Sequence, residues 1–235
     1  MIKAAYETGY RRALVKILSP KPDWTVLNLP CGAGTLAVTL AQKVRVVTAV
    51  DPSASILNMV DDRCAMEGIP NVRTVLGDWD DDCGTLGIQK HDIAVASRTP
   101  QAEDLCSAVL KLDRMATKLV CLITTIGDGP YDRRIFEAAG RDLEAGPHYL
   151  YNYNLLRRVG IEANVAIIRE TQRRTYASPD EALDTIRWMM DGFSGREEGR
   201  LKAYLNEHLV RRRERWTLDY PSEIRWAAMW WKKKE

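Results

Sequence analysis

The 235-residue chain lacks long apolar runs and obvious linkers. No stretch reaches the roughly 18 consecutive apolar residues of a transmembrane helix. The first residues are charged throughout, unlike the apolar core of a secretion signal. No stretch rich in proline, glycine and serine separates two parts of the chain. We therefore expect a single domain over residues 1–235, with no membrane span and a cytoplasmic location.

Cysteine and net charge are also scarce. The five cysteines are scattered, with no C-x-x-C pair for zinc or redox chemistry, so free thiols and no metal site are expected. The 34 Lys and Arg residues nearly balance 32 Asp and Glu residues, for a formal net charge of +2. Such a charge is too small for a nucleic-acid-binding field over the whole surface. The one basic cluster, residues 211–215, is interpreted as the solvated end of a helix, with an anionic contact as the alternative.

What the chain does contain is a regular alternation of strand and helix patterns. Strands alternating with helices indicate an α/β fold with a mostly parallel sheet and helices on both faces. Runs of β-branched and aliphatic residues predict strands at 24–29, 44–50, 71–78, 91–98, 118–126, 164–170 and 223–233. Amphipathic patterns predict helices at about 3–18, 35–44, 53–68, 102–112, 148–159, 178–190 and 197–213.

The helix at 53–68 shows how these limits are set. Ser53 is a suitable N-cap and Gly68 a suitable stop, and the predicted buried face contains Ile56, Met59, Val60 and Cys64. A helical insert at about 171–220 lies between the last two predicted strands. We expect this insert and the N-terminal helix to cap the active site.

Residues suited to ligand binding follow the first strand. Ligands bind outside the carboxyl ends of the strands in an open parallel sheet. The first strand ends at Asn28 and leads into the turn that contains Cys31, Gly32, Ala33 and Gly34. Glycines let the backbone approach a ligand closely, and the next helix offers amides at its N-terminus. This turn is a candidate binding loop.

The next two strands end in residues suited to a nucleoside. Asp51 and Pro52 follow the second strand, where a carboxylate can accept hydrogen bonds from both hydroxyls of a ribose. Gly77, Asp78 and Trp79 follow the third strand and offer an acceptor for an amine and a flat indole for adenine. Together the three loops predict a pocket for an adenosine with a polar tail.

These motifs resemble those of the class I S-adenosylmethionine-dependent methyltransferases. NLPCGAG is similar to the family's first motif, although Asn28 stands where an acidic residue is usual and Pro30 where the first glycine is usual. The last strand, IRWAAMWW, resembles the family's antiparallel seventh strand. The resemblance implies a Rossmann-like, seven-stranded sheet of order 3-2-1-4-5-7-6. It also implies S-adenosylmethionine as cofactor, with S-adenosylhomocysteine as product.

The resemblance also implies roles for individual residues. Gly32 and Gly34 would flank the methionine part of the cofactor, Asp51 would bind the ribose, and Asp78 with Trp79 would bind adenine. At the end of the fourth strand, Ser97 is a further cofactor candidate. The candidates for the acceptor pocket are Tyr6, Tyr10, Arg98 and His148.

The expected reaction is an in-line displacement that moves a methyl group to a small-molecule acceptor. The sulfonium group activates the methyl, so positioning and water exclusion are the protein's main tasks and no general base is assigned. The turn through Ala37 also fits the dinucleotide pattern G-x-G-x-x-A. An NAD-dependent oxidoreductase is therefore one alternative. An RNA methyltransferase and a non-catalytic module that binds the cofactor are the others, and the oligomeric state stays open.

Overall fold

The computed structural model describes residues 9–78, 80–97, 104–144 and 149–233, and the chain forms two compact units. The first, named the sheet unit, contains Gly9–Thr124, Tyr149–Ile168 and Trp226–Glu235. The second, named the insert unit, contains Thr125–His148 and Arg169–Arg225 in addition to Met1–Thr8. Each is described by itself below.

The main sheet has seven strands in the order β3-β2-β1-β4-β5-β10-β6. Because β10 is the seventh of these strands along the chain, the predicted order 3-2-1-4-5-7-6 is confirmed. The pairs β1–β2, β1–β4, β2–β3 and β4–β5 are parallel. The strands are β1 (Thr25–Asn28), β2 (Val46–Asp51), β3 (Val72–Leu76), β4 (His91–Ser97), β5 (Ala116–Ile126), β6 (Asn164–Gln172) and β10 (Ser222–Lys232).

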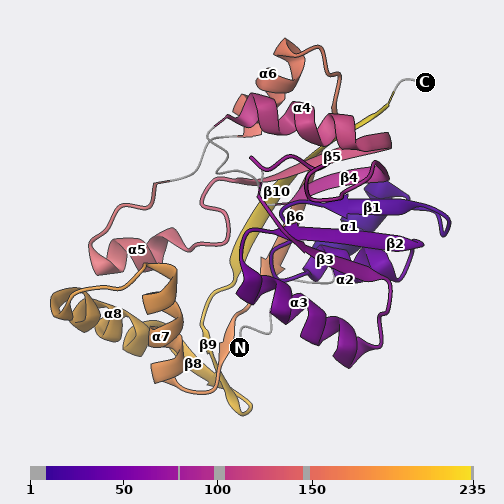
Figure 1. The fold of residues 1–235 in the computed structure, drawn as a ribbon. Helices are drawn as coiled ribbons and strands as arrows, with labels where there is room; N and C mark the ends of the chain where they lie inside the picture. Colours follow the sequence, from indigo (N-terminus) through magenta and orange to yellow (C-terminus); the bar gives the residue numbers. More distant parts are fainter. Residues whose placement is uncertain (1–8, 79, 98–103, 145–148, 234–235) are drawn as a thin grey trace. The chain divides into compact units, whose positions relative to one another are not determined.

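Five helices belong to the sheet unit (Figure 1): α1 (Gly9–Leu18), α2 (Thr35–Ala41), α3 (Ala54–Glu67), α4 (Leu105–Met115) and α6 (Tyr149–Arg158). The unit's core joins the strands to α4 and α6, with Leu27, Val120 and Leu156 fully buried. A continuous apolar run such as that of β4 suits a strand with both faces covered.

Helix α3 begins and ends where its sequence predicts. The Ser53 hydroxyl accepts a hydrogen bond from the Ile56 amide (3.4 Å), and Gly68 takes a left-handed conformation with φ of 65°. The predicted buried face is only partly correct, because Met59 is 54% exposed. Leu57 is buried instead, together with Val60 and Cys64. These three residues lie at i, i+3 and i+7, which form one helical stripe.

The insert unit has its own core and its own small sheet. Its helices are α5 (Arg133–Ala139), α7 (Pro179–Met189) and α8 (Gly195–His208). Its sheet has the order β7-β9-β8, formed by Thr175–Tyr176, Arg215–Leu218 and Leu209–Arg212. Figure 1 shows α7, α8, β8 and β9 in the orange to yellow part of the chain. The predicted insert therefore contains strands as well as helices, and α5 was not predicted.

The predicted helix at 197–213 is wrong at its end. Helix α8 stops at His208, and β8 pairs with β9 in antiparallel register from Leu209↔Leu218 to Arg212↔Arg215. Leu209 and Leu218 are both buried in the core of the insert unit. Arginine is a good helix former, but helix propensities differ by less than about 1 kcal/mol per residue, and this strand pairing with its burial outweighs them.

Two further properties bear on function. All five cysteines are free, as their spacing predicts. Within the described parts of the chain, the helices are all too short or too polar to cross a membrane.

Candidate functional site

The turn after β1 is held between the two neighbouring strands by backbone hydrogen bonds. The amide of Leu29 donates to the carbonyl of Val95 in β4 (3.0 Å), and the amide of Cys31 donates to that of Val50 in β2 (2.8 Å). The Leu29–Pro30 peptide bond between them is cis. The turn thus starts at the carboxyl ends of three adjacent strands, where open parallel sheets bind ligands.

The two glycines of this turn have different surroundings. Gly32 and Gly34 have φ angles of 50° and 71°, in the left-handed region that favours glycine. A Cβ atom at Gly34 would lie 2.9 Å from Cγ2 of Val60 in α3. A Cβ atom at Gly32 would meet no described atom within 4 Å. Gly34 therefore lets the turn pack on α3, whereas Gly32 faces open space that a ligand can enter.

Asp51 joins all three loops. Its Oδ2 accepts a hydrogen bond from the Gly32 amide (2.9 Å) and its Oδ1 accepts one from the Ser53 amide (3.1 Å). Its backbone carbonyl accepts a third from the Gly77 amide (3.2 Å). The residue is 7% exposed. Because an ionised carboxylate offers about four acceptor positions, the two amides leave room for further donors.

The third loop is placed by packing as well as by hydrogen bonds. Gly77 is buried, and a Cβ atom there would lie 2.5 Å from Cδ1 of Leu86, so a larger residue would displace that side chain. Asp78 is exposed, and its amide donates to Oδ2 of Asp81 (2.8 Å). Trp79 lies outside the described residues.

The Cys31 thiol is not a nucleophile in this setting. Burial, together with the nearby carboxylate of Asp51, raises the pKa of Cys31 to about 12. The thiol is thus neutral near pH 7, and the thiolate is the reactive form. Ala33 and Pro52, the other predicted loop residues, are both exposed.

Asn28, at the end of β1, holds a buried acceptor. The side chain is completely buried, and its Nδ2 donates to the carbonyls of Pro30 (3.0 Å) and Val95 (3.4 Å). Its Oδ1 has no hydrogen-bond partner among the described residues. A buried acceptor without a donor costs about 1–3 kcal/mol. The atom is therefore suited to receive an N–H or O–H group from a ligand.

Tyr10 and Ser97 connect helix α1 to the end of β4. Their hydroxyl oxygens are 2.6 Å apart, and Tyr10 is only 5% exposed. The Tyr10 ring also packs on Trp226 of β10, with 5.1 Å between ring centroids. The structure thus brings two predicted site residues from distant segments into contact. The other three candidates, Tyr6, Arg98 and His148, lie outside the described residues.

His91 lies at the opposite end of β4 from Ser97 and has a structural role. Its Nδ1 lies 2.7 Å from the carbonyl of Gln89, and its Nε2 lies 2.8 Å from the hydroxyl of Thr48. A neutral ring that donates from Nδ1 and accepts at Nε2 satisfies both contacts. Burial lowers the pKa of His91, which favours this neutral form.

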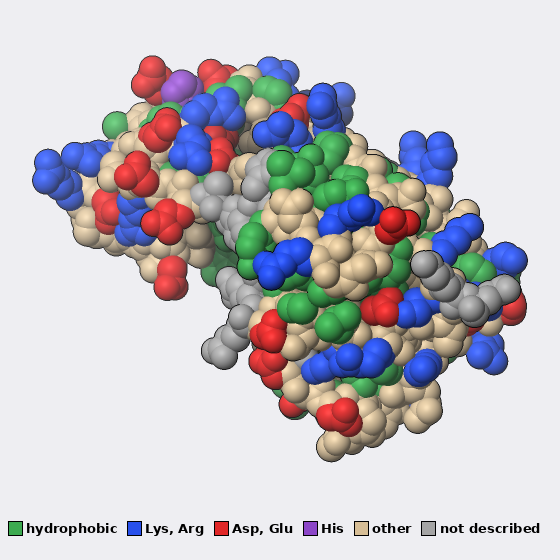
Figure 2. Space-filling model, turned by 90° about the horizontal axis from the view of Figure 1, so that it is seen from above, with side chains coloured by type: hydrophobic (Ala, Val, Ile, Leu, Met, Phe, Trp, Pro, Cys, Tyr) green, Lys and Arg blue, Asp and Glu red, His purple; other side chains and the backbone are tan. Residues whose placement is uncertain are grey.

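Possible metal ligands and the distribution of charge bear on the expectations from the sequence. Within the described residues, no three His, Cys, Asp or Glu side chains are grouped to hold a metal ion. The basic cluster at 211–215 lies on the hairpin of β8 and β9 rather than at a helix end. On the face shown in Figure 2, basic and acidic side chains are interspersed.

Two contacts of the site had no signal in the sequence. Val60 closes off the space behind Gly34, and Trp226 supports Tyr10. Val60 was expected only on the buried face of a helix, and Trp226 only within the last strand. Each contact joins segments that are distant along the chain, so periodicity and local motifs cannot reveal it.

Part of the chain is similar to a known protein family. Residues 26–113 match a family model described as a methyltransferase domain. A curated relative, an uncharacterized protein of Haemophilus influenzae, is 29% identical over 226 residues, which cover 95% of this chain and 82% of that protein.

Solved structures show the same fold. A proposed methyltransferase from Bacillus halodurans matches with a TM-score of 0.65 and 17% identity, over 96% of this chain and 99% of that one. Coclaurine N-methyltransferase, with N-methylheliamine and S-adenosylhomocysteine bound, matches with a TM-score of 0.54 and 16% identity. That match covers 98% of this chain and 75% of the other. At these identities the likeness establishes the fold alone.

Proposed function

We propose that the chain is a class I S-adenosylmethionine-dependent methyltransferase that transfers the methyl group of this cofactor to a small-molecule acceptor. The observation that carries the proposal is the meeting of three strand-end loops at Asp51, beside the open space at Gly32. Such a junction at the carboxyl edge of a parallel sheet is where an adenosine with a polar tail fits.

The residues present fit the cofactor. Asp51 keeps acceptor positions for the ribose hydroxyls after it has bound the amides of Gly32 and Ser53. Asn28 Oδ1 is a buried acceptor suited to the ammonium group of the methionine part. Its amide oxygen accepts a hydrogen bond but adds no negative charge, so it binds the ammonium less strongly than a carboxylate would. Gly32 leaves the space that the methionine part requires.

The protein's own residues supply positioning. When bound, the cofactor would supply a methyl group on a positively charged sulfur. The acceptor atom would attack the methyl carbon in line, and the sulfur would leave as the neutral thioether. Asp51 and the glycine turn hold the cofactor at a set position against the sheet, and fixed orientation is a large part of catalysis in such a reaction. The Tyr10–Ser97 hydroxyl pair keeps α1 against the end of β4. The neutral Cys31 thiol takes no part as a nucleophile.

A small acceptor is supported by the charge distribution and by one structural neighbour. The net charge of +2 is too small to attract nucleic acid over the whole surface. On the face that Figure 2 shows, basic and acidic side chains are interspersed rather than gathered in a basic patch. Coclaurine N-methyltransferase, which shares the fold, was solved with N-methylheliamine bound.

Calorimetric titration tests the cofactor. S-adenosylhomocysteine should bind at one site, whereas NAD should give no heat of binding. Any ligand present at about a hundred times its Kd should also raise the stability by roughly 2.7 kcal/mol, which thermal denaturation measures independently. Binding of NAD without binding of S-adenosylhomocysteine would overturn the proposal in favour of an oxidoreductase.

A labelling experiment tests the acceptor class. The protein is incubated with S-adenosylmethionine labelled in its methyl group and a cell extract, and the label is followed in the small-molecule, RNA and protein fractions. We expect label in the small-molecule fraction, and its loss in an Asp51→Asn control. Label found only in RNA or protein would refute a small-molecule acceptor while leaving methyl transfer intact.

A further inference from the structure

The insert unit contains a polar cavity of about 220 Å³. It is formed by the segment that follows β5 and by the first residues of β10, and all of these residues belong to one unit. The cavity is therefore formed without any residue of the cofactor loops, and the inference below does not rest on the proposed function. Its charged lining residues are Asp128, Asp132, Arg133, Arg134, Glu223 and Arg225.

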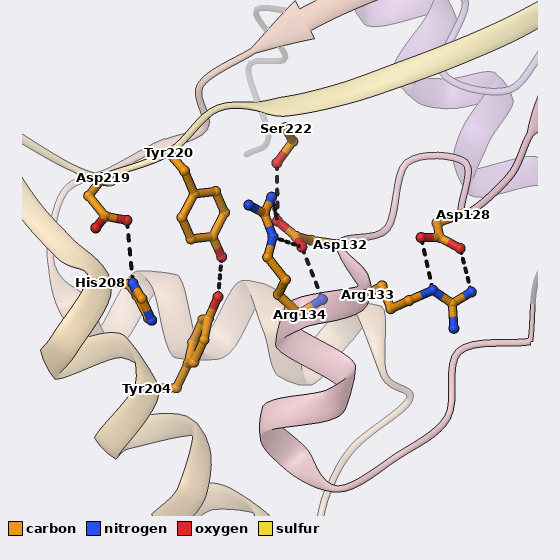
Figure 3. A network of polar contacts seen from close by, with 9 residues as sticks. All are labelled: Asp128, Asp132, Arg133, Arg134, Tyr204, His208, Asp219, Tyr220 and Ser222. Atoms are coloured by element: carbon orange, nitrogen blue, oxygen red, sulfur yellow. Dashed lines mark hydrogen bonds and ion pairs between the residues drawn. The ribbon is translucent and has the colours of Figure 1, made fainter.

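Two of the three arginines are fixed by carboxylates. Nη2 of Arg133 lies 2.5 Å from Oδ1 of Asp128, and its Nε donates to Oδ2 (3.2 Å). Arg134 donates from Nε and Nη2 to the two oxygens of Asp132, both at 2.9 Å. Figure 3 shows both forked pairs. These contacts hold each guanidinium group in a set plane.

The two arginine–aspartate pairs form one wall of the cavity, and a network of aromatic and hydroxyl groups supports this wall (Figure 3). The guanidinium carbon of Arg134 lies 3.5 Å from the ring centroid of Tyr220. The Tyr220 hydroxyl contacts that of Tyr204 in α8, and Ser222 Oγ donates to Asp132 Oδ2 (3.4 Å). Burial raises the pKa of the Tyr220 hydroxyl, so this hydroxyl stays protonated and uncharged near neutral pH. The guanidinium groups of this wall are therefore already held in place without a ligand, which reduces the entropy that is lost when a ligand binds.

Arg225 differs from the other two arginines. Its Nε lies 3.8 Å from Oε1 of Glu223, which is too long for a hydrogen bond. The side chains of Arg225 and Glu223 are 46% and 55% exposed. Within the described residues, Glu223 is the only carboxylate that pairs with Arg225. Its donors are thus only loosely engaged at the edge of a built cavity.

The balance of donors and acceptors defines the ligand. Each guanidinium has five N–H donors and no acceptor, so three of them supply more donors than the paired carboxylates can accept. We infer that this cavity binds a small oxyanion, the carboxylate or phosphate group of a metabolite, with Arg225 as its main contact and Arg133 and Arg134 beside it. Glu223, loosely held and exposed, competes with the ligand for Arg225.

Titration of the full-length protein with inorganic phosphate and with malonate tests this inference. The two probes distinguish a phosphate from a carboxylate ligand, and binding of either one supports the site. Arg225→Gln should weaken binding about tenfold because a charge-assisted hydrogen bond is lost. Glu223→Gln should strengthen it severalfold because the competing carboxylate is removed. Arg212→Gln, which changes an exposed arginine on β8 by the same charge, should leave the affinity unchanged.

The opposite signs make the test decisive. Failure of both probes to bind the wild-type protein would overturn the site. So would equal losses in the Arg225 and Arg212 variants, since that result indicates a general charge effect. If Arg225→Gln does not fold by circular dichroism, Arg225→Lys keeps the charge and should still weaken binding, because lysine cannot form the planar fork. Unchanged binding in that variant would count against the inference. Loss of S-adenosylhomocysteine binding would affect only the proposed function.

Discussion

Replacing the two glycines of the β1 turn by alanine separates their roles. Gly32 and Gly34 are two residues apart and both have positive φ angles, 50° and 71°. Alanine pays about 1–2 kcal/mol to adopt a left-handed conformation, so this cost is common to both variants. Any further difference between them must come from what the new methyl group touches. The pair is therefore a matched test of the site's geometry.

The structure predicts that Gly34→Ala is the more destabilising change. Its new Cβ would lie 2.9 Å from Cγ2 and 3.1 Å from Cγ1 of Val60, a side chain with no exposed surface. Overpacking of a buried position adds about 1–3 kcal/mol, for a total of about 2–5 kcal/mol. Gly32→Ala has no described atom within 4 Å of its Cβ and should cost only about 1–2 kcal/mol.

Urea denaturation followed by circular dichroism measures both values. The further variant Val60→Ala, combined with Gly34→Ala, should be more stable than the sum of the single changes predicts, because the new methyl occupies vacated space. Titration with S-adenosylhomocysteine should show a large loss of affinity in Gly32→Ala, whose methyl enters the open space. Equal destabilisation by the two alanines, or strict additivity with Val60→Ala, would refute the packing assigned to Gly34.

Three other predictions follow from the sheet unit. Asp51→Asn should weaken S-adenosylhomocysteine binding at least about tenfold, because one oxygen and the charge are lost, and an unchanged Kd in calorimetry would remove the assignment to the ribose. Tyr10→Phe should lower the free energy of unfolding by about 0.5–1.5 kcal/mol and weaken the cofactor severalfold, because Ser97 loses its partner; no change in either quantity would contradict a positioning role. Burial lowers the pKa of His91 in the folded protein, so just below about pH 6.5 the unfolded chain binds a proton that the folded protein does not. The free energy of unfolding should therefore fall as the pH drops below about 6.5. In His91→Asn that decline should be smaller, and an identical pH dependence in urea denaturation would show that burial of His91 is not its source.

The alternation of elements was predictable because it depends on local patterns. Buried parallel strands are continuous apolar runs, and helix limits follow from capping residues such as Ser53 and Gly68. The strand order came from family resemblance, since hydrophobic periodicity alone does not say which strands are neighbours. The observed sheet confirms both the alternation and the order.

The errors occurred where a long-range contact outweighed a local preference. Residues 209–212 continue an arginine-rich helical pattern, yet Leu209 pairs with Leu218 and is buried in a separate core. Met59 was predicted on the buried face of α3, but it is exposed, and the packed stripe runs through Leu57 and Val60. Amphipathic spacing locates the buried stripe of a helix only to within about one sequence position. The strands that pack against the helix decide which residues are buried.

The candidate site shows the same division. The glycine turn, Asp51 and Gly77 each carry a local motif, so their sequence indicates three loops at the carboxyl ends of strands. Only the folded chain makes Asp51 the common acceptor for all three, leaves Asn28 Oδ1 buried without a donor among the described residues, and joins Tyr10 to Ser97. The cavity around Arg225 had no motif in the sequence, because its lining comes from two segments about 90 residues apart along the chain.

The sequence by itself determined the class of fold, the edge of the sheet where a binding site is expected and the kind of cofactor to expect. These follow from periodicity, from turn residues with special backbone requirements, and from a motif that resembles a known family. Tertiary structure decided which glycine packs and which faces open space, which arginine is only loosely paired, and where helix gives way to strand. The physical reason is that each of these features depends on contacts between segments that are far apart along the chain. A short stretch of sequence carries no information about the free energy of such contacts.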